Sequence, residues 1–317
     1  MRGNPGGLLD EAINVSNIFI PKGAEIVSTK GKLEEWTKVY NTKNQPIDAK
    51  IPLVVLTDER SASAAEIVAG VVQDYDRGVL VGRKTYGKGL VQQTRPLAYN
   101  AQLKVTTAKY YIPSGRCIQA IDYSTEGTAK IADSLKSTFR TSSGRAVLDG
   151  GGVDPDILID PSKFAVVSYR LMQKNLIFNY ATKYYFDHDT LASARDFELS
   201  EPEFQQFLAW LERQSFDYQT PLEIKLEQAL DLAKAGARSE QVHQSIIELN
   251  ALLQSEKKKD LIHHEREIKQ LLEQDIVSRY FLQEGIIEAS FDTDPDILKA
   301  VEILEDTESY DGILKPN

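Results

Sequence analysis

Two serines and one lysine within residues 57–92 are the side chains of this chain best placed for nucleophilic chemistry. Ser61 and Ser63 come just before an apolar helical pattern, and Lys88 stands between two glycines. A serine nucleophile needs a base that accepts its proton. This stretch contains no histidine, so the lysine is the nearby candidate for the base.

Ser63 has two interpretations. With Glu66 three residues later it fits a capping box, in which the serine and the glutamate satisfy the first N–H groups of a helix. Capping serines far outnumber nucleophiles. The same position also suits catalysis, because a helix start after a buried parallel strand is where α/β proteins place ligands, and its free N–H groups favour negative charge. The residues alone leave both interpretations open.

Lys88 also has two interpretations. A desolvated lysine loses its preference for the ammonium form and can act as a base. Gly87 and Gly89 allow backbone conformations that would turn the side chain inward. The alternative is a solvated loop lysine, as most lysines are.

The chain has four histidines, all in its second half. A Ser-His-Asp triad can join residues that are distant in sequence, so this position does not exclude one. No histidine has a distinguishing context, and the pair before Glu265 is typical of a charged, solvated helix face. The four are His188, His243, His263 and His264.

The elements that must position Ser63 and Lys88 follow an alternating pattern. Residues 53–57 and 78–82 are continuous apolar runs, which indicate buried strands, and residues 64–76 between them have helical apolar spacing. Strand, helix and strand in this order predict a βαβ unit with parallel strands. Residues 9–19 predict a further helix, and residues 103–112 alternate as a strand does. The first half therefore predicts an α/β fold.

From about residue 161 the pattern becomes helical. Ser200 and Thr220 are each followed by proline and then by glutamate at the third helical position, which predicts two helix starts. Residues 239–281 carry a long helical repeat, whose polar middle (254–260) fits either a solvated helix or the bend of a hairpin. Asp294 and Pro295 predict one more short helix. We expect a core at residues 1–160 and a helical region at 161–317.

The composition excludes several classes of protein. The 317 residues carry a net charge of −10, which argues against a general nucleic-acid binder. No apolar run reaches the ~20 residues of a membrane span, and the first residues contain no secretory signal. The single Cys117 excludes an internal disulfide and a cysteine-based zinc site.

Several motifs in order along residues 1–160 resemble the C-terminal processing peptidases, serine peptidases with a Ser/Lys dyad that are related to the tail-specific proteases. Any one motif is a weak signal, but their order makes the resemblance specific. The motifs are RGNPGGL (2–8), SASAAEI (61–67), QD (73–74), TYGKG (85–89), VQ (91–92), TTAKYYIPSGR (106–116) and GVDPDI (152–157). Alanine at position 65 and cysteine at position 117 depart from the serines of many members.

The resemblance implies a role for each matching residue. Ser63 would be the nucleophile, and Lys88 the base, buried within hydrogen-bond reach of the serine. Gln92 would support the lysine. The oxyanion hole would be formed by the backbone N–H groups of Gly6, Gly7 and Ala64. Glu66 and Asp74 also fall on positions with supporting roles in some members. For these two we expect helix capping and a solvated carboxylate, respectively.

The resemblance further implies a ClpP/crotonase-like α/β core, incomplete at its N-terminal side, followed by a mainly helical C-terminal region. The expected reaction is hydrolysis of peptide bonds in protein substrates through an acyl-enzyme, without metal or cofactor. The compartment implied for the full-length protein is the periplasm or cell envelope. We expect the helical tail to serve assembly, including homo-oligomerisation, or regulation rather than chemistry.

Members of this family carry a PDZ domain and further core strands before the glycine-rich motif. We therefore expect this chain alone to be a poor peptidase. Two other classes stay open: a catalytically silent binding or scaffold fragment, and, less favoured, an acyl-CoA enzyme on a crotonase-like core. A covalent serine probe separates the peptidase from both.

Overall fold

The computed structural model describes residues 1–123, 129–161, 163–236, 240–257 and 259–315. It divides the chain into two compact units, one formed by Met1–Pro161 together with Asp294–Asn317 and the other by Ser162–Thr293. The sequence predicts a single boundary near residue 160. In the structure the helices after residue 294 belong to the first unit instead, because their apolar side chains pack on its strands.

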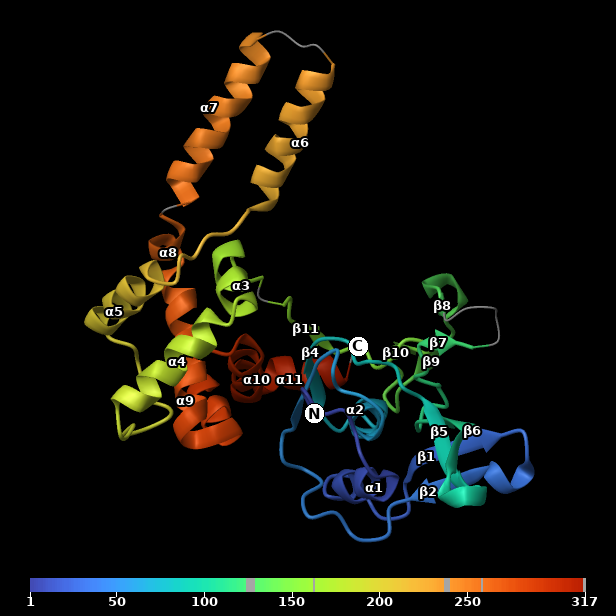
Figure 1. The fold of residues 1–317 in the computed structure, drawn as a ribbon. Helices are drawn as coiled ribbons and strands as arrows, with labels where there is room; N and C mark the ends of the chain where they lie inside the picture. Colours follow the sequence, from blue (N-terminus) through green and yellow to red (C-terminus); the bar gives the residue numbers. More distant parts are fainter. Residues whose placement is uncertain (124–128, 162, 237–239, 258, 316–317) are drawn as a thin grey trace. The chain divides into compact units, whose positions relative to one another are not determined.

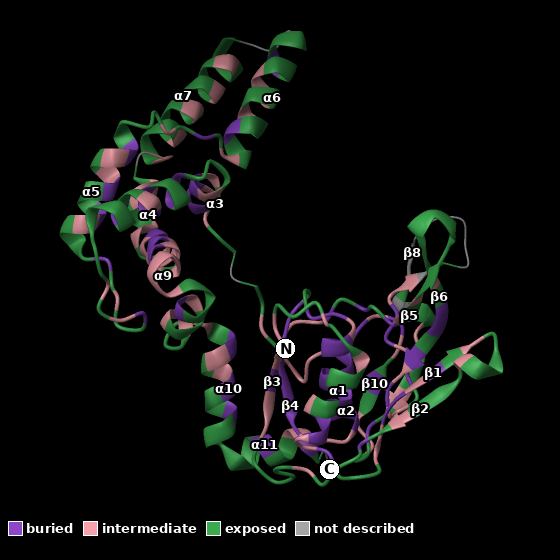
Figure 2. Ribbon diagram, turned by 60° about the horizontal axis from the view of Figure 1, so that its bottom comes forward, coloured by how far each residue is buried: buried purple, intermediate pink, exposed green. Residues whose placement is uncertain are grey.

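A βαβ unit forms the centre of the first unit, as the apolar runs predict (Figure 1). Strand β3 (Val54–Thr57) pairs in parallel with β4 (Val79–Gly82), and β11 (Ile157–Leu158) pairs in parallel with the other side of β4. Helix α2 (Ala64–Asp74) connects the first two strands, and every one of its residues is buried (Figure 2). This burial explains why its sequence is apolar on almost all sides.

The second sheet of this unit is antiparallel and has the strand order β2-β1-β6-β5. It is built around β6 (Gln102–Tyr111), which pairs with both β1 and β5, and a register shift interrupts the β5–β6 ladder after Val91. Helix α1 (Leu9–Asn17) packs against α2. The remaining elements of the unit are β1 (Glu25–Gly31), η1 (Glu34–Trp36), β2 (Lys38–Asn41), β5 (Leu90–Pro96), η2 (Ala98–Asn100), β7 (Ile121–Asp122), β8 (Ala129–Lys130), η3 (Asp133–Leu135), β9 (Thr138–Arg140) and β10 (Ala146–Leu148).

The two C-terminal helices, α10 (Pro295–Glu305) and α11 (Thr307–Leu314), cover the β3–β4 side of the parallel sheet. Ile303 and Tyr310 pack against the valines of β4. The Tyr310 hydroxyl also donates to the carbonyl of Leu53 and accepts from its N–H, at 3.2 and 2.9 Å. Asp294 caps α10, as the sequence predicts, by accepting from the N–H groups of Asp296 and Ile297.

The second unit is helical and has a separate apolar core. Phe204, Phe207 and Tyr180 lie at its centre, with the Tyr180 and Phe207 rings 5.0 Å apart. The predicted helix starts at Ser200 and Thr220 are confirmed. Its helices are α3 (Val166–Gln173), α4 (Leu176–Asp187), α5 (Glu201–Glu212), α6 (Pro221–Ala235), α7 (Glu240–Lys257), α8 (Asp260–His263) and α9 (Glu265–Ser290).

The long helical repeat of residues 239–281 is therefore not one helix. Helix α7 ends at Lys257, and the four-residue α8 precedes α9. Within the described residues, no helix is long and apolar enough to cross a membrane.

Candidate active site

Ser63 occupies the N-cap position of α2, directly before its first helical residue. Its backbone has φ 56° and ψ −117°, a conformation that non-glycine residues rarely adopt. Such strain persists only where the surrounding structure imposes it, and it is concentrated at functional sites. Ser61 differs: it is fully buried, and its hydroxyl donates to the Met1 carbonyl and contacts Asp58 Oδ1. The structure thus leaves Ser63 as the accessible serine of this pair.

The glycine-rich turn lies directly against Ser63. A Cβ atom on Gly6 would come within 2.8 Å of the Ser63 Cβ and 2.5 Å of the Ala62 carbonyl oxygen, and Gly6 has φ +88°. No other residue type fits here without displacing the backbone. The hydrogen bond between the Ala62 N–H and the Asn4 carbonyl (2.9 Å) fixes this approach.

The three predicted oxyanion donors are not equivalent. The Gly6 N–H already donates to the Asn4 side chain at 2.8 Å. The N–H groups of Gly7 and Ala64 have no acceptor among the described residues. A pocket of about 260 Å³ opens beside all three, with apolar walls from α1 and α2 that include Val15.

Glu66 does more than cap the helix. Its carboxylate is fully buried and accepts four hydrogen bonds, two on each oxygen. One oxygen accepts from Thr85 Oγ1 (2.5 Å) and the Gly87 N–H (2.7 Å). The other accepts from the N–H groups of Ser63 and Lys88, both at 2.8 Å. Burial raises the pKa of Glu66, although these hydrogen bonds oppose the shift. One carboxylate thus joins the serine to the lysine loop.

We expect Glu66→Gln to lower the free energy of unfolding of the first unit by about 2 kcal/mol, because in either orientation the amide nitrogen would face at least one buried N–H donor that it cannot satisfy. The measurement is urea denaturation followed by Trp36 fluorescence in a Trp210→Phe background. Glu11 occupies the same third position of α1 but is exposed. Glu11→Gln should therefore change stability by less than about 0.5 kcal/mol. Equal effects of the two substitutions would contradict this role of Glu66.

Lys88 does not lie as the sequence predicts. Its side chain is exposed, and no hydrogen bond joins it to Ser63 within the described part of the chain. Gly87 and Gly89 do not turn the Lys88 side chain inward. Each instead allows a close contact with another segment. A Cβ on Gly87 would lie 2.4 Å from Ala120 Cβ, and one on Gly89 would lie 2.8 Å from the Gln119 N atom. These glycines let the chain around residue 119 pack against the loop. The expectation of a buried Lys88 is thus wrong for this structure.

Gln92, predicted to support the lysine, is also exposed and lies on β5. No hydrogen bond of its side chain joins it to Lys88 within the described residues. The structure thus brings Ser63, Gly7 and Ala64 together, and it leaves Lys88 and Gln92 turned to solvent.

Tyr110 is a site residue that the sequence analysis does not identify. It is 4% exposed, and its hydroxyl donates to the Lys88 carbonyl and lies within hydrogen-bond reach of the Ser63 side chain. Burial raises the pKa of Tyr110, and the nearby charge of Glu66 raises it further. Since the tyrosine proton goes to Lys88, its oxygen is left to accept from Ser63. Its place in the TTAKYYIPSGR motif is the only signal that could have indicated it.

Tyr110→Phe should lower the free energy of unfolding by about 1–2 kcal/mol, because a buried carbonyl and the Ser63 hydroxyl lose a partner. Tyr111 is the matched control, since it is the next residue of β6 and only partly buried. Tyr111→Phe should stay within about 0.5 kcal/mol of the unsubstituted chain. The same denaturation measurement applies to both, and an equal loss in both variants would argue against the proposed contact.

Asp74 is not the solvated carboxylate that the sequence suggests. It is 2% exposed and forms an ion pair with Arg116, itself 1% exposed, at 2.9 Å. Asp74 Oδ2 accepts from the Ser114 N–H at 2.9 Å. Burial raises the pKa of Asp74 although Arg116 opposes this. Gln73 extends the network by accepting from Arg116 (2.7 Å) and donating to Asp156 (2.9 Å). Three motifs thus meet to hold the end of α2.

Arg2 joins the glycine-rich motif to the C-terminal segment. Its guanidinium pairs with Asp294 at 2.7 Å and with Asp296 at 2.8 Å, and these contacts raise the pKa of Arg2. Asp296 is 1% exposed, so one end of this network is buried. The helix that follows residue 294 therefore helps to anchor the turn beside Ser63.

The described residues contain no group of three or more histidine, cysteine, aspartate or glutamate side chains able to hold a metal ion. The four histidines belong to the second unit. His188 stacks on Tyr184 with ring centroids 3.9 Å apart.

Comparison with known proteins places these features in a family. Residues 1–127 match the model of peptidase family S41, and residues 167–304 match that of the probable PDZ-protease, C-terminal helical domain. The chain is 47% identical over 121 residues to a carboxy-terminal-processing protease of Bartonella bacilliformis, covering 38% of this chain and 28% of the relative. It is 43% identical over 120 residues to a probable CtpA-like serine protease of Staphylococcus epidermidis, covering 37% and 24%.

Among solved structures, the photosystem II D1 C-terminal processing protease is similar over 51% of this chain and 33% of its own, with 28% identity and a TM-score of 0.38. The chain spans about a quarter of the length of the curated relatives it matches. It carries a peptidase S41 domain followed by a PDZ-protease C-terminal helical domain. The resemblance stated from the motifs is confirmed.

Proposed function

We propose that this protein is a serine endopeptidase of the C-terminal processing type, which hydrolyses protein substrates through an acyl-enzyme on Ser63. The observation that carries the proposal is the strained backbone of Ser63 at the start of α2, next to the N–H groups of Gly7 and Ala64, which have no acceptor among the described residues. Two such donors next to a nucleophile are what a tetrahedral intermediate requires. The family match of residues 1–127 supports the same conclusion.

In the proposed reaction Ser63 Oγ attacks the scissile carbonyl carbon, and the N–H groups of Gly7 and Ala64 stabilise the resulting oxyanion. Lys88 accepts the serine proton and delivers it to the leaving amine. Water then attacks the ester, and Ser63 regains its proton. The 260 Å³ pocket beside these donors would receive an apolar side chain of the substrate. Gln92 would hold the lysine once it has turned inward.

This mechanism requires the exposed side chain of Lys88 to turn toward Ser63. The Lys88 backbone is already tied to the serine through Glu66 and Tyr110, so the movement involves the side chain. Bound substrate would also remove water from the lysine, which favours its neutral form. The hydrogen bond between Tyr110 and Ser63 would have to yield to this new partner.

We further propose a periplasmic or envelope location and homo-oligomerisation through the helical unit. The first rests on the family resemblance. The second rests on exposed apolar side chains of α6 and α7, such as Leu232 and Leu252.

Trapping the acyl-enzyme tests the proposal directly. The chain is mixed with an activated peptide ester, quenched with acid within milliseconds to seconds, digested and examined by mass spectrometry. We expect an acyl adduct on the peptide that contains Ser63. The silent scaffold fragment and the acyl-CoA enzyme both predict no serine adduct, and finding none across the time course would reject the peptidase.

A further inference from the structure

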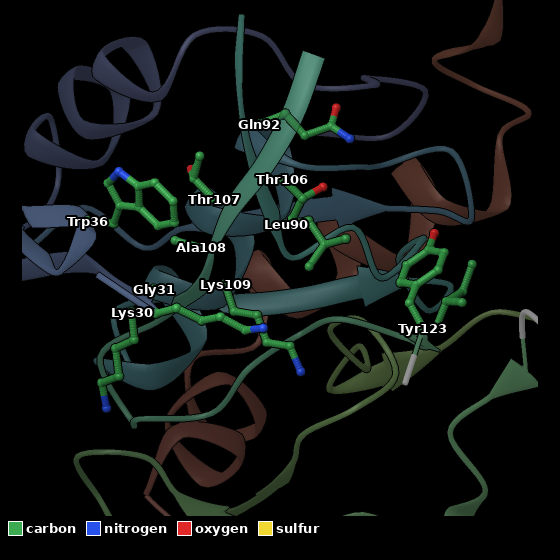
Figure 3. A pocket seen from close by; sticks show the side chains of 12 residues that line it. Lys30, Gly31, Trp36, Leu90, Gln92, Thr106, Thr107, Ala108, Lys109 and Tyr123 are labelled. Atoms are coloured by element: carbon green, nitrogen blue, oxygen red, sulfur yellow. The ribbon is translucent and has the colours of Figure 1, made fainter. Parts of the chain in front are cut away.

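The glycine-rich turn beside Ser63 is supported by the loop after β3 and by the start of α10. The pocket of about 760 Å³ over the antiparallel sheet includes Lys109 of β6 in its lining (Figure 3). The next residue of this strand, Tyr110, reaches Ser63. Successive side chains of a strand point to opposite faces, so this pocket and the serine lie on opposite sides of β6. The start of α10, in contrast, contacts the turn directly.

Two tethers hold the turn to the loop between β3 and α2. The Gly3 N–H donates to Asp58 Oδ1 at 2.9 Å, and the Asn4 carbonyl accepts from the Ala62 N–H at 2.9 Å. Both partners belong to this one loop, so these bonds leave the turn free to pivot about it. Gly7 lies farther along the turn, and its N–H has no acceptor among the described residues. The position of this donor therefore depends on a support from another side.

Arg2 provides that support through the start of α10. Its Nη1 atom lies 2.7 Å from a carboxylate oxygen of Asp294 and 2.8 Å from one of Asp296, residues that are 292 and 294 positions away. Asp296 Oδ2 also lies 3.8 Å from Nη1 of Arg83, which directly follows β4. Arg83 is held in turn by Glu59 at 2.8 Å. Asp296 thus joins the turn to the carboxyl end of the parallel sheet.

Stability alone does not account for the carboxylate of Asp296. The residue is 1% exposed, and its Oδ1 atom has no hydrogen-bond partner among the described residues. A buried carboxylate costs free energy of folding unless its oxygens are satisfied. Asp296 is not needed as a helix cap either, because Asp294 already accepts from the first N–H groups of α10. Such an exception to hydrogen-bond satisfaction fits a group that serves a reaction.

We propose that Asp296 is a positioning residue for the oxyanion hole, which acts through Arg2 to hold the turn at Gly7 beside Ser63. Residues 294–304 are then a working part of the active site, although they belong to the region that matches the helical-domain model. Oxyanion donors stabilise a transition state only when they are fixed in place beforehand, so a loosened turn slows acylation. The inference rests on the proposed peptidase function, and its structural step, the tethering of the turn, can be tested without hydrolysis.

The first measurement follows the turn of the full chain without substrate. Asp296→Asn keeps the size of the side chain and removes its charge. We expect amide hydrogen exchange in residues 3–8 to become about tenfold faster, while exchange in α2 stays within about twofold. Mass spectrometry of peptides from the two segments measures both. Glu302→Gln is the matched control, because Glu302 lies on the same helix, is exposed and pairs only with Lys299 among the described residues. It should change neither rate.

The second measurement is single-turnover acylation of Ser63 by an activated peptide ester. Asp296→Asn should lower the maximal rate by about tenfold and leave the half-saturating ester concentration within about twofold. Arg2→Gln should have the same effect, and the double variant should be no slower than either single variant, because the two residues act through one contact. Arg2→Lys keeps the positive charge and should retain most of the rate.

Several results would overturn the positioning role. These are unchanged exchange in the turn, an equal rise of exchange in the turn and in α2, losses of rate that multiply in the double variant, and a higher half-saturating concentration at an unchanged maximal rate. If no acyl-enzyme forms on the unsubstituted chain, the proposed function fails, and the exchange measurement alone decides whether Asp296 holds the turn.

Discussion

Replacing Ser63 with alanine should lower the rate of peptide hydrolysis by about 10⁴-fold or more, leaving only the contribution of binding and of the oxyanion donors. The physical reason is that, among the described residues, Ser63 is the accessible hydroxyl at the start of α2, next to the N–H groups of Gly7 and Ala64. Because we expect this chain alone to be a poor peptidase, the loss is measured with an activated peptide ester, as the rate at which its alcohol is released.

Ser61→Ala is the control for this substitution. Ser61 is buried and its hydroxyl is occupied by the Met1 carbonyl and Asp58, so it supports the loop and does not face the substrate. Its replacement should lower stability by about 1 kcal/mol and leave labelling by a fluorophosphonate probe measurable. Labelling of Ser63→Ala at the level of the unsubstituted chain would show that the nucleophile lies elsewhere.

Lys88→Arg should be as inactive as Lys88→Ala, each with a loss of about 10²–10⁴-fold in hydrolysis. A guanidinium stays protonated at working pH and cannot accept the serine proton, although it keeps the charge and much of the length of lysine. The exposed position of Lys88 means that neither substitution should unfold the chain. Stability and activity can therefore be separated at this residue.

Lys84→Ala provides the comparison for a neighbouring lysine. Lys84 forms an ion pair with Asp154 at 2.9 Å and is only partly buried. Its loss should change activity by no more than a few-fold, since such pairs contribute about 0–1 kcal/mol. Substantial hydrolysis by Lys88→Arg would rule out the Ser/Lys mechanism. It would favour a histidine as the base that accepts the serine proton.

Local patterns along the chain were sufficient to predict much of the fold. The apolar runs at residues 53–57 and 78–82 became β3 and β4 with α2 between them. The helix caps at Ser200, Thr220 and Asp294 lie where their side chains predict. Such features depend on residues within a few positions of one another, whose spacing is visible in the sequence.

Contacts between distant segments decided the rest. From the sequence alone Asp74 is expected to be a surface acid. In the structure it is paired with Arg116, 42 residues later. From the sequence alone Glu66 is expected to cap a helix. In the structure residues 85–88 also donate hydrogen bonds to its carboxylate. Residues 294–315 continue the helical pattern of the tail, yet their apolar side chains pack on the strands of the first unit, where they cover the valines of β4.

The candidate site likewise combines features set by the local sequence with features set by contacts between distant segments. The sequence by itself determined that Ser63 begins a helix after a buried strand, since capping and apolar periodicity are local. Only the tertiary structure decided that its backbone is strained, that Tyr110 reaches its hydroxyl, and that Lys88 faces solvent. The direction of a side chain depends on what occupies the space around it. Around Ser63 that space is filled by Gly6 and Tyr110, which are 57 and 47 positions away along the chain.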